Sequence, residues 1–150
     1  MTETTDFAAA INSALGGWNR AMGLSFRLAT ADAVVAELVV GPEHLQPYGI
    51  IHGGVYAGII ETVCSTGAAL AAARNGQVVV GVDNHSTFLR ATREGKLTVR
   101  AAPLTRGRKT QVWDGRVEDE HGKLIATGRV RLICLDGGSE LAGENVSVRG

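Results

Sequence analysis

A single carboxylate lies inside the longest apolar stretch of this chain. Glu61 is the one charged residue between Gly53 and Ala73, and its neighbours are apolar or small. A buried carboxylate is costly because a low dielectric disfavours its ionised form, so such a group is paired, neutral or used in a reaction. Glu61 is therefore our first candidate for catalysis, either as a nucleophile or as a general base. The alternative is a carboxyl group that merely hydrogen-bonds to a neighbouring hydroxyl, such as that of Thr62 or Ser65.

A pair of glycines stands just upstream of this stretch, in the motif His52-Gly53-Gly54. A helix that begins here would leave backbone N–H groups without intrahelical partners, and the helix dipole favours an anion at that end. The N–H of Gly53 could therefore hold an oxyanion, and the missing side chain would let a reacting group approach the backbone. A tight turn that requires glycine is the alternative interpretation.

The patterning around these residues predicts an α+β fold. We expect a short helix, two strands, a loop, a long helix and four further strands, at 7–15, 24–31, 33–40, 41–53, 54–73, 78–88, 95–104, 109–118 and 124–135. The tail from 136 contains several glycines and is expected to be disordered. Because the long helix is apolar nearly all round, an antiparallel sheet must curl around it, and one helix face could need a partner subunit.

Length and composition indicate one domain over residues 1–150. The formal net charge is zero and the basic residues are scattered, which argues against a nucleic-acid partner. Two cysteines, Cys64 and Cys134, form neither a disulfide framework nor a metal-binding pair, and Cys64 is expected in the core. The acidic N-terminus lacks the cationic region of a signal peptide, so we expect a cytoplasmic protein.

The apolar run that contains Glu61 is long enough to raise the question of a membrane span. We do not expect one, because the run also holds hydroxyl residues and glycines and is followed by strand-like segments. A central helix enclosed by a sheet is apolar on most sides as well. We therefore expect no membrane partner. No metal site, P-loop or dinucleotide motif is present in the sequence, so we also expect no cofactor.

Two segments resemble the hotdog-fold acyl-CoA thioesterases. The first is Gln46-Pro-Tyr-Gly-Ile-Ile-His-Gly-Gly54 followed by Glu61, and the second is Asn84-His-Ser-Thr-Phe-Leu-Arg90 followed by Arg93-Glu-Gly95. The likeness covers roughly residues 24–135 and is nearest, among phenylacetate-type thioesterases, to the branch typified by the Arthrobacter 4-hydroxybenzoyl-CoA thioesterase. It implies a hotdog fold, and hydrolysis of an acyl-CoA thioester whose acyl group is aryl or of short to medium length.

The resemblance also implies assembly. Members of the family form at least a homodimer and often a homotetramer, and their active sites lie at a subunit interface. There the helix acid of one chain faces the helix N-terminus of the other, which would let Gly53 and Glu61 share a site although some two turns of helix separate them. The expected partners are a second copy of the chain and a small-molecule acyl-CoA, with coenzyme A present only as part of the substrate.

Five catalytic positions carry over from the family: Glu61, Gly53, Gln46, His52 and Ser65. Glu61 would attack the thioester or activate water, and the Gly53 N–H would polarise the thioester carbonyl. Gln46 would contact water or the carbonyl, and Ser65, one turn after Glu61, would position water or the carboxylate. His52 would orient the loop or touch the thioester oxygen. For these last three residues an ordinary structural role is the alternative.

A second group of residues is expected to bind the substrate and its coenzyme A part: Gly54, Asn84, His85, Arg90, Arg108 and Lys109. The three cationic residues are the candidates for the phosphates, because guanidinium and ammonium groups match phosphate oxygens. Relatives tend to carry small hydroxyl residues near 108 and 109, so these two positions depart from the family pattern.

Other aromatic and histidine residues are open to two interpretations. Tyr48, Tyr56 and Trp113 could contact an aromatic acyl ring or simply pack. His44 and His121 are expected to be ordinary loop residues.

Three other functions remain open from the sequence. A proofreading thioesterase would act on carrier-protein thioesters with the same residues. A hotdog dehydratase usually pairs a catalytic histidine with an acid, whereas His52 lies next to the oxyanion turn, which favours a thioesterase. An acyl-CoA-binding protein without chemistry would bind its ligand and release no thiol.

Overall fold

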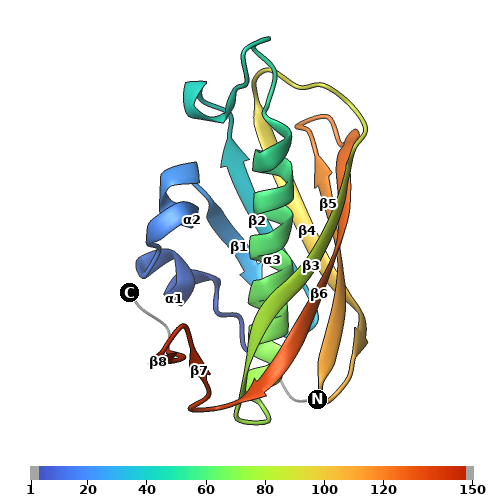
Figure 1. Ribbon diagram of the computed structural model, residues 1–150. Coiled ribbons are helices and arrows are strands. Elements are labelled where there is room, and N and C mark those ends of the chain that lie inside the picture. The colour runs from blue at the N-terminus through green and yellow to red at the C-terminus, as the bar shows by residue number, and fades with distance from the viewer. Residues whose placement is uncertain (1–3, 148–150) are drawn as a thin grey trace.

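The computed structural model of this protein describes residues 4–147, and its central element is one long helix inside a curved sheet (Figure 1). The elements in chain order are α1 (Ala8–Ser13), α2 (Gly17–Met22), β1 (Ser25–Ala29), β2 (Val34–Val39), the 3-10 helix η1 (Pro42–His44), α3 (Gly53–Ala73), β3 (Gln77–Phe88), β4 (Lys96–Arg106), β5 (Thr110–Glu118), β6 (Leu124–Asp136), β7 (Glu140–Leu141) and β8 (Glu144–Asn145). The predicted α+β fold, with an antiparallel sheet around a central helix, is confirmed.

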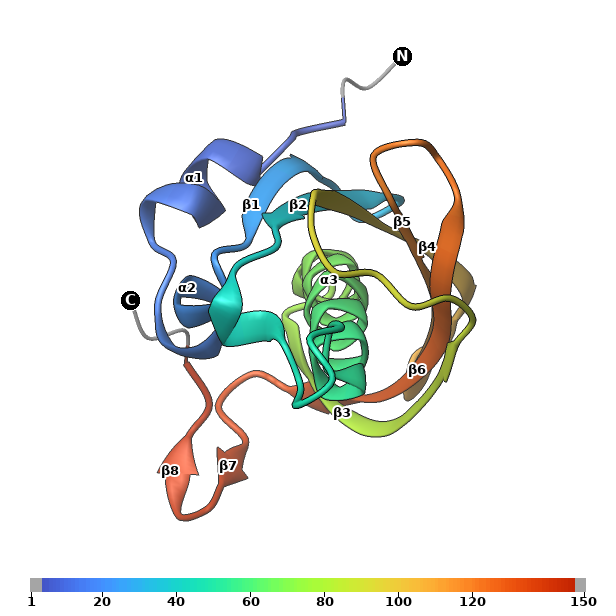
Figure 2. The ribbon, with the colours of Figure 1, turned by 90° about the horizontal axis from the view of Figure 1, so that it is seen from above.

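Six strands form one antiparallel sheet in the order β1-β2-β4-β5-β6-β3. Seen from above, the sheet curls around α3 from β2 through β4, β5 and β6 to β3 (Figure 2). β3 pairs with β6 along its length, with an irregularity between Gly81 and Asp83. β3 is an edge strand, and its other side has no strand neighbour among the described residues.

The core lies between α3 and the inner face of the sheet. Along β4, β5 and β6, buried side chains alternate with more exposed ones, so one face of each strand closes on the helix. Trp113 of β5 is fully buried against Gly67 of α3, where any side chain would overlap the indole ring. The Trp113 Nε1 donates to Gln111 Oε1 (2.8 Å), and the Gln111 amide donates to the Ala68 carbonyl (3.1 Å). Trp113 is therefore a packing residue, not a substrate contact.

The sequence analysis does not predict α2, a short helix that covers the outer side of α3 (Figure 2). It ends at Gly23, whose left-handed conformation (φ 73°) forms the C-cap. The ring of Trp18 lies against Gly58, and Asn19 Oδ1 accepts a hydrogen bond from Thr62 Oγ1 (2.8 Å). The residues that α2 contacts, Gly58 and Thr62, lie on α3, much later in the chain. Local sequence patterns therefore give little sign of α2.

The C-terminal segment differs from the predicted disorder. After β6 the chain forms a turn and the short β7–β8 hairpin, in which the Val146 N–H donates to the Ser139 carbonyl (2.9 Å). Gly138 (φ 86°) and Gly143 (φ 81°) adopt the positive φ that these turns need. The glycines that suggest disorder in the sequence thus form turns here. Residues 148–150 of the predicted tail lie outside the described residues.

By length and composition, α3 is the one helix in residues 4–147 that could cross a membrane. It is mostly buried and packs against β3, β4, β5 and β6. This position explains its apolar composition, because the sheet surrounds it on several sides (Figure 2).

His44 is not the ordinary loop residue that the sequence suggests. Its side chain is 1% exposed, and it joins two segments that are distant in sequence. The N–H of Gly41 donates to Nδ1 (2.8 Å), so Nε2 must carry the proton that it donates to the Met22 carbonyl (2.8 Å). His44 thereby fixes the start of the loop that leads to α3 against the end of α2.

Candidate active site

The first turn of α3 has one backbone donor without a partner. His52 is the N-cap: its Nδ1 accepts a hydrogen bond from the Gly54 N–H (2.8 Å), and its carbonyl accepts from Val55 (2.9 Å). The N–H of Gly53 donates to no acceptor within residues 4–147. A donor is thus free at the positive end of the helix dipole, where an anion is favoured. The neighbouring Gly54, a predicted substrate contact, uses its N–H for the cap instead.

Phe88 explains why position 53 is a glycine. This residue ends β3, and its ring lies so close to Gly53 that a methyl group there would overlap it. The ring also stacks in a tilted arrangement on Tyr56, with 5.7 Å between the ring centroids. Two aromatic rings, one from the strand and one from the helix, therefore flank the free donor.

A cavity of about 340 Å³ opens beside this helix start. It is lined by Gln46, Ile50, Ile51, Gly53, Tyr56, Phe88, Leu89, Arg90 and Ala91. The walls are mainly apolar, and the polar groups that line it are few, as in small-molecule sites. Three predicted site residues, Gln46, Gly53 and Arg90, are brought together here. Tyr48, by contrast, is 83% exposed and does not line the cavity.

Loop contacts fix the position of Gln46. Its backbone N–H donates to the Ile50 carbonyl (2.8 Å), its carbonyl accepts from Gly49 (2.9 Å), and its Oε1 accepts from the Tyr48 N–H. The Arg93 Nη1 donates to the Tyr48 carbonyl (2.8 Å) and holds the same loop from outside. In this conformation the Gln46 side-chain oxygen closes the turn, while its amide nitrogen remains available as a donor.

Glu61 is held by side chains from two elements. Asn84 of β3 donates from Nδ2 to Glu61 Oε2 (2.9 Å) and to the Ala57 carbonyl (3.1 Å). Ser65, one turn later on α3, donates from Oγ to Glu61 Oε1 at 3.4 Å. The carboxylate lies over Gly81 of β3, where a side chain would overlap it. Glu61 is half-buried in the single chain, not fully buried as its sequence surroundings suggest.

Gly53 and Glu61 are separated along the same helix. Eight residues at ~1.5 Å per residue put their backbones about 12 Å apart. Glu61 does not line the cavity that contains Gly53. Within one chain, the free donor and the carboxylate therefore form two separate half-sites.

The predicted phosphate-binding residues lie at opposite ends of α3. Arg90 is beside the N-terminal end, whereas Arg108 and Lys109 are in the β4–β5 turn near the C-terminal end. Arg108 lines a hollow there together with Asn75, and its carbonyl accepts from the Gln77 amide (3.1 Å). One chain thus does not bring the three cations together.

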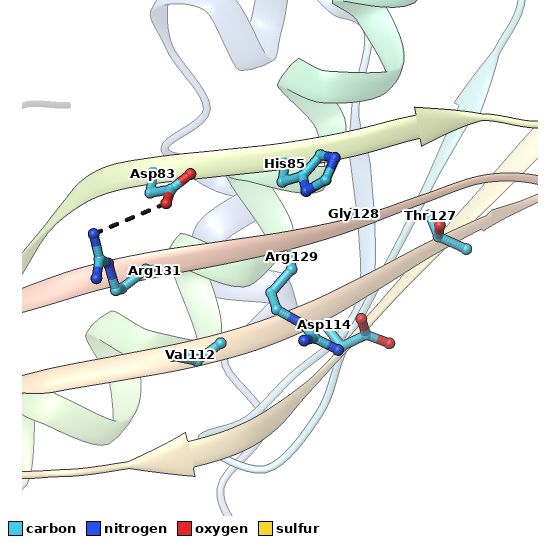
Figure 3. A pocket seen from close by; sticks show the side chains of 8 residues that line it. All are labelled: Asp83, His85, Val112, Asp114, Thr127, Gly128, Arg129 and Arg131. Atoms are coloured by element: carbon cyan, nitrogen blue, oxygen red, sulfur yellow. Dashed lines mark ion pairs between the residues drawn. The ribbon is translucent and has the colours of Figure 1, made fainter.

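His85 lies on the outer face of the sheet. Successive residues of a strand point to opposite faces, so His85 points away from the face on which Asn84 contacts Glu61. It lines a hollow of about 380 Å³ formed by β3, β5 and β6, where Asp83 and Arg131 approach to 3.9 Å (Figure 3). The structure therefore separates His85 from both half-sites.

Cys64 is in the core, as the sequence predicts. Its side chain is fully buried on α3, and burial raises the pKa of its thiol far above the ordinary value, with a smaller contribution from the nearby Glu61 carboxylate. A thiol in this environment stays protonated and is a poor nucleophile. Within residues 4–147, no three His, Cys, Asp or Glu side chains are grouped so that they could hold a metal ion.

Comparison with known proteins identifies the family. The sequence profile described as the thioesterase superfamily matches residues 48–126 of this chain. A protein of Mycobacterium tuberculosis that is named as an esterase is 38% identical over 117 residues, which are 77% of this chain and 84% of that protein. This chain belongs to the thioesterase superfamily.

Solved structures of related proteins share the fold of this thioesterase. The structure of the M. tuberculosis esterase is 37% identical, has a TM-score of 0.78, and is matched over 79% of this chain and 96% of its own. A thioesterase from Haemophilus influenzae is 31% identical with a TM-score of 0.81, over 86% of this chain and 90% of its own. The hotdog fold is thereby confirmed, and the chain is an enzyme of the thioester hydrolase type.

The sequence analysis does not single out Phe88 as a site residue of this thioesterase. It occurs within the segment 84–90, which resembles the family, but nothing in its local pattern shows that it meets Gly53. Gly53 lies thirty-five residues before Phe88 in the sequence, so the contact joins the end of a strand to the start of a much earlier helix. Only the three-dimensional arrangement shows it.

Proposed function

We propose that this thioesterase hydrolyses an acyl-CoA thioester to a free acid and coenzyme A, at a site that two copies of the chain build together. The observation that carries the proposal is the pair of half-sites on α3. One is the unpartnered N–H of Gly53 beside an apolar cavity, and the other is the Glu61 carboxylate oriented by Asn84 and Ser65.

The chemistry follows from these two groups. The Gly53 N–H donates to the thioester carbonyl oxygen and stabilises the negative charge that develops on it. Glu61 either takes a proton from the water that attacks the carbonyl carbon, or attacks that carbon itself to give a mixed anhydride that water then hydrolyses. In both routes the C–S bond breaks, and coenzyme A leaves as the thiolate and acquires a proton.

The proposal of a composite site depends on β3 being the last strand of the sheet, with one edge that pairs with no other strand of the described residues. Its second side carries backbone groups without a strand neighbour among the described residues, and the edge residue Val82 is 48% exposed. Such an edge favours pairing with another chain. A two-fold axis beside β3 would pair two such edges, since a C2 interface uses the same patch on both copies. Glu61, which contacts β3 through Asn84, would then lie near the partner's cavity. A homotetramer made from two such dimers is the larger assembly that we expect.

The acyl group that we propose is aryl or of short to medium length. Its support is the resemblance to the 4-hydroxybenzoyl-CoA branch and the aromatic walls that Tyr56 and Phe88 give the cavity. Arg90 at the same cavity is the cation best placed for a phosphate of coenzyme A.

Thiol release measured with a chromogenic trap tests the function. The panel is 4-hydroxybenzoyl-, phenylacetyl-, hexanoyl- and palmitoyl-CoA, each with the wild type and with Glu61→Gln, which keeps the size of the side chain. We expect release from at least one of the first three substrates and a loss of about 10²–10⁴-fold in the variant. Tight binding without release from any of them would instead indicate an acyl-CoA-binding protein. An acyl-carrier-protein thioester is assayed beside this panel, and thiol release from that thioester alone would indicate a proofreading role.

A further inference from the structure

Phe88 occupies an unusual position for a half-exposed aromatic residue. It is 52% exposed at the end of the edge strand β3, yet one side of its ring is in contact with the backbone of Gly53. An exposed phenylalanine is normal by itself, but this one lies against the free donor of the helix start. A thioester carbonyl that accepts a hydrogen bond from Gly53 therefore brings a substituent of its carbonyl carbon close to the ring.

The ring of Phe88 packs against a second aromatic ring, that of Tyr56. Tyr56, one turn into α3, is 2% exposed and stacks on Phe88 with 5.7 Å between the centroids. Burial raises the pKa of Tyr56, and its hydroxyl makes no hydrogen bond within the described residues that satisfies normal geometry, although the Thr92 hydroxyl is close enough to offset the shift in part. A pair of tilted aromatic rings is stabilising beyond the area that it buries, so Tyr56 helps to hold the ring of Phe88 in place.

The rest of the cavity contains no other aromatic side chain. Ile50, Ile51, Leu89 and Ala91 complete the apolar wall, while Gln46 and Arg90 supply its polar side-chain groups. Phe88 is therefore the large side chain that limits the space next to the Gly53 donor. A flat acyl group could lie against the ring, whereas a long flexible chain would have to displace it.

We propose that Phe88 is the residue that sets the acyl specificity of this thioesterase, by presenting its ring as the wall against which the acyl group packs. The inference rests on the proposed hydrolysis of acyl-CoA. It assigns the substrate class to acyl groups that are flat or short at the carbons next to the carbonyl.

The test is a comparison of kcat/KM for benzoyl-CoA and decanoyl-CoA in the wild type, in Phe88→Ala and in Phe88→Leu. Leu104→Ala is the matched control, because Leu104 is 54% exposed on β4 and lines none of the hollows described above. We expect Phe88→Ala to change the benzoyl-to-decanoyl ratio roughly tenfold in favour of decanoyl-CoA, since an aromatic contact of about 1.4 kcal/mol corresponds to that factor. The Phe88→Leu variant, which keeps an apolar side chain and the strand, should move the ratio in the same direction by less.

Three outcomes would overturn the inference, and they are distinguishable. A wild type that releases thiol from benzoyl-CoA, with a ratio that stays within about twofold in both Phe88 variants, shows that Phe88 does not set specificity. A wild type that releases no thiol from these two substrates or from any acyl-CoA of the panel above refutes the proposed function, and the inference falls with it. A wild type that hydrolyses acyl-CoA but prefers decanoyl-CoA to benzoyl-CoA contradicts the inference alone. Thermal unfolding of each variant checks that a lost activity does not come from lost structure.

Discussion

At the residue scale, the orientation of Glu61 depends on its hydrogen-bond partners. It is half-buried, and Asn84 and Ser65 each donate a hydrogen bond to its carboxylate. The sequence identifies Glu61 because no other charge lies near it on the helix. It does not reveal that Asn84, which the family resemblance suggests as a substrate contact, instead hydrogen-bonds to the catalytic candidate from another element.

We predict that Asn84→Ala lowers kcat for the best acyl-CoA substrate roughly tenfold, because one hydrogen bond to a charged group contributes about 1.5–3 kcal/mol. KM should change little, since Asn84 positions Glu61. Steady-state kinetics measure both constants. A raised KM with an unchanged kcat would show that Asn84 binds the substrate, as the sequence suggests.

The oxyanion donor can be tested at Gly53 itself. Gly53→Ala adds a Cβ that meets Phe88 but keeps the N–H, whereas Gly53→Pro adds a similar atom and removes the N–H. Proline is tolerated at the first position of a helix, and His52 already has the extended conformation that precedes proline (φ −63°, ψ 131°).

We therefore predict that Gly53→Pro has a kcat about 10²–10³-fold lower than that of Gly53→Ala, which is the usual loss for one oxyanion donor. Thiol release by the two variants and their thermal unfolding provide the comparison. If both variants fold and turn over at the same rate, the Gly53 N–H is not the donor.

At the element scale, the strands of the main sheet and α3 could be predicted closely from the sequence, whereas α2 could not. β4, β5 and β6 have clear alternation of buried and exposed residues, and their ends lie within two residues of the prediction. α3 begins one residue before its predicted start, because the cap is made by His52 and not by Gly53. α2 could not be predicted, because its stability comes from the contacts of Trp18 and Asn19 with α3 and not from its own pattern.

The docking of α1 should depend on pH. Asp6 accepts hydrogen bonds on Oδ1 from the N–H groups of Ala8 and Ala29 (both 2.9 Å), so it joins α1 to β1. These two backbone donors hold the pKa of Asp6 below its ordinary value. Because the folded-state pKa is depressed, the contribution of Asp6 to stability is present above the unfolded-state pKa and is lost as the pH falls through the folded-state pKa.

We predict that Asp6→Ala has a lower urea midpoint than the wild type at pH 7 and that this difference disappears as the pH falls from about 5 to below about 3. Urea titrations across that range measure it. Thr4→Ala, a nearby exposed position, is the control. A difference that persists undiminished in acid would show that the charge on Asp6 is not what stabilises this contact.

At the scale of the whole molecule, the fold keeps the two proposed half-sites apart within one chain. The sheet surrounds α3 on several sides but leaves the edge of β3 open, and the two half-sites lie on the same helix about 12 Å apart. The sequence predicts both half-sites and, through the family resemblance, a shared interface. It did not predict that Arg108 and Lys109 lie far from Arg90, because that separation arises from the strand pairing, which places the β4–β5 turn and the end of β3 at opposite ends of the sheet.

Subunit complementation tests the central claim most directly. Glu61→Gln and Gly53→Pro are each expected to be almost inactive, and equal amounts are refolded together so that mixed dimers form. In a mixed dimer one of the two sites would contain both altered residues and the other would contain neither.

If Gly53 of one chain works with Glu61 of its partner, the mixture should regain about a quarter of the wild-type thiol release, since half of the dimers are mixed and each has one intact site. Size-exclusion chromatography establishes that dimers are present in the sample. A mixture of dimers that is no more active than the two variants measured separately would contradict the composite site.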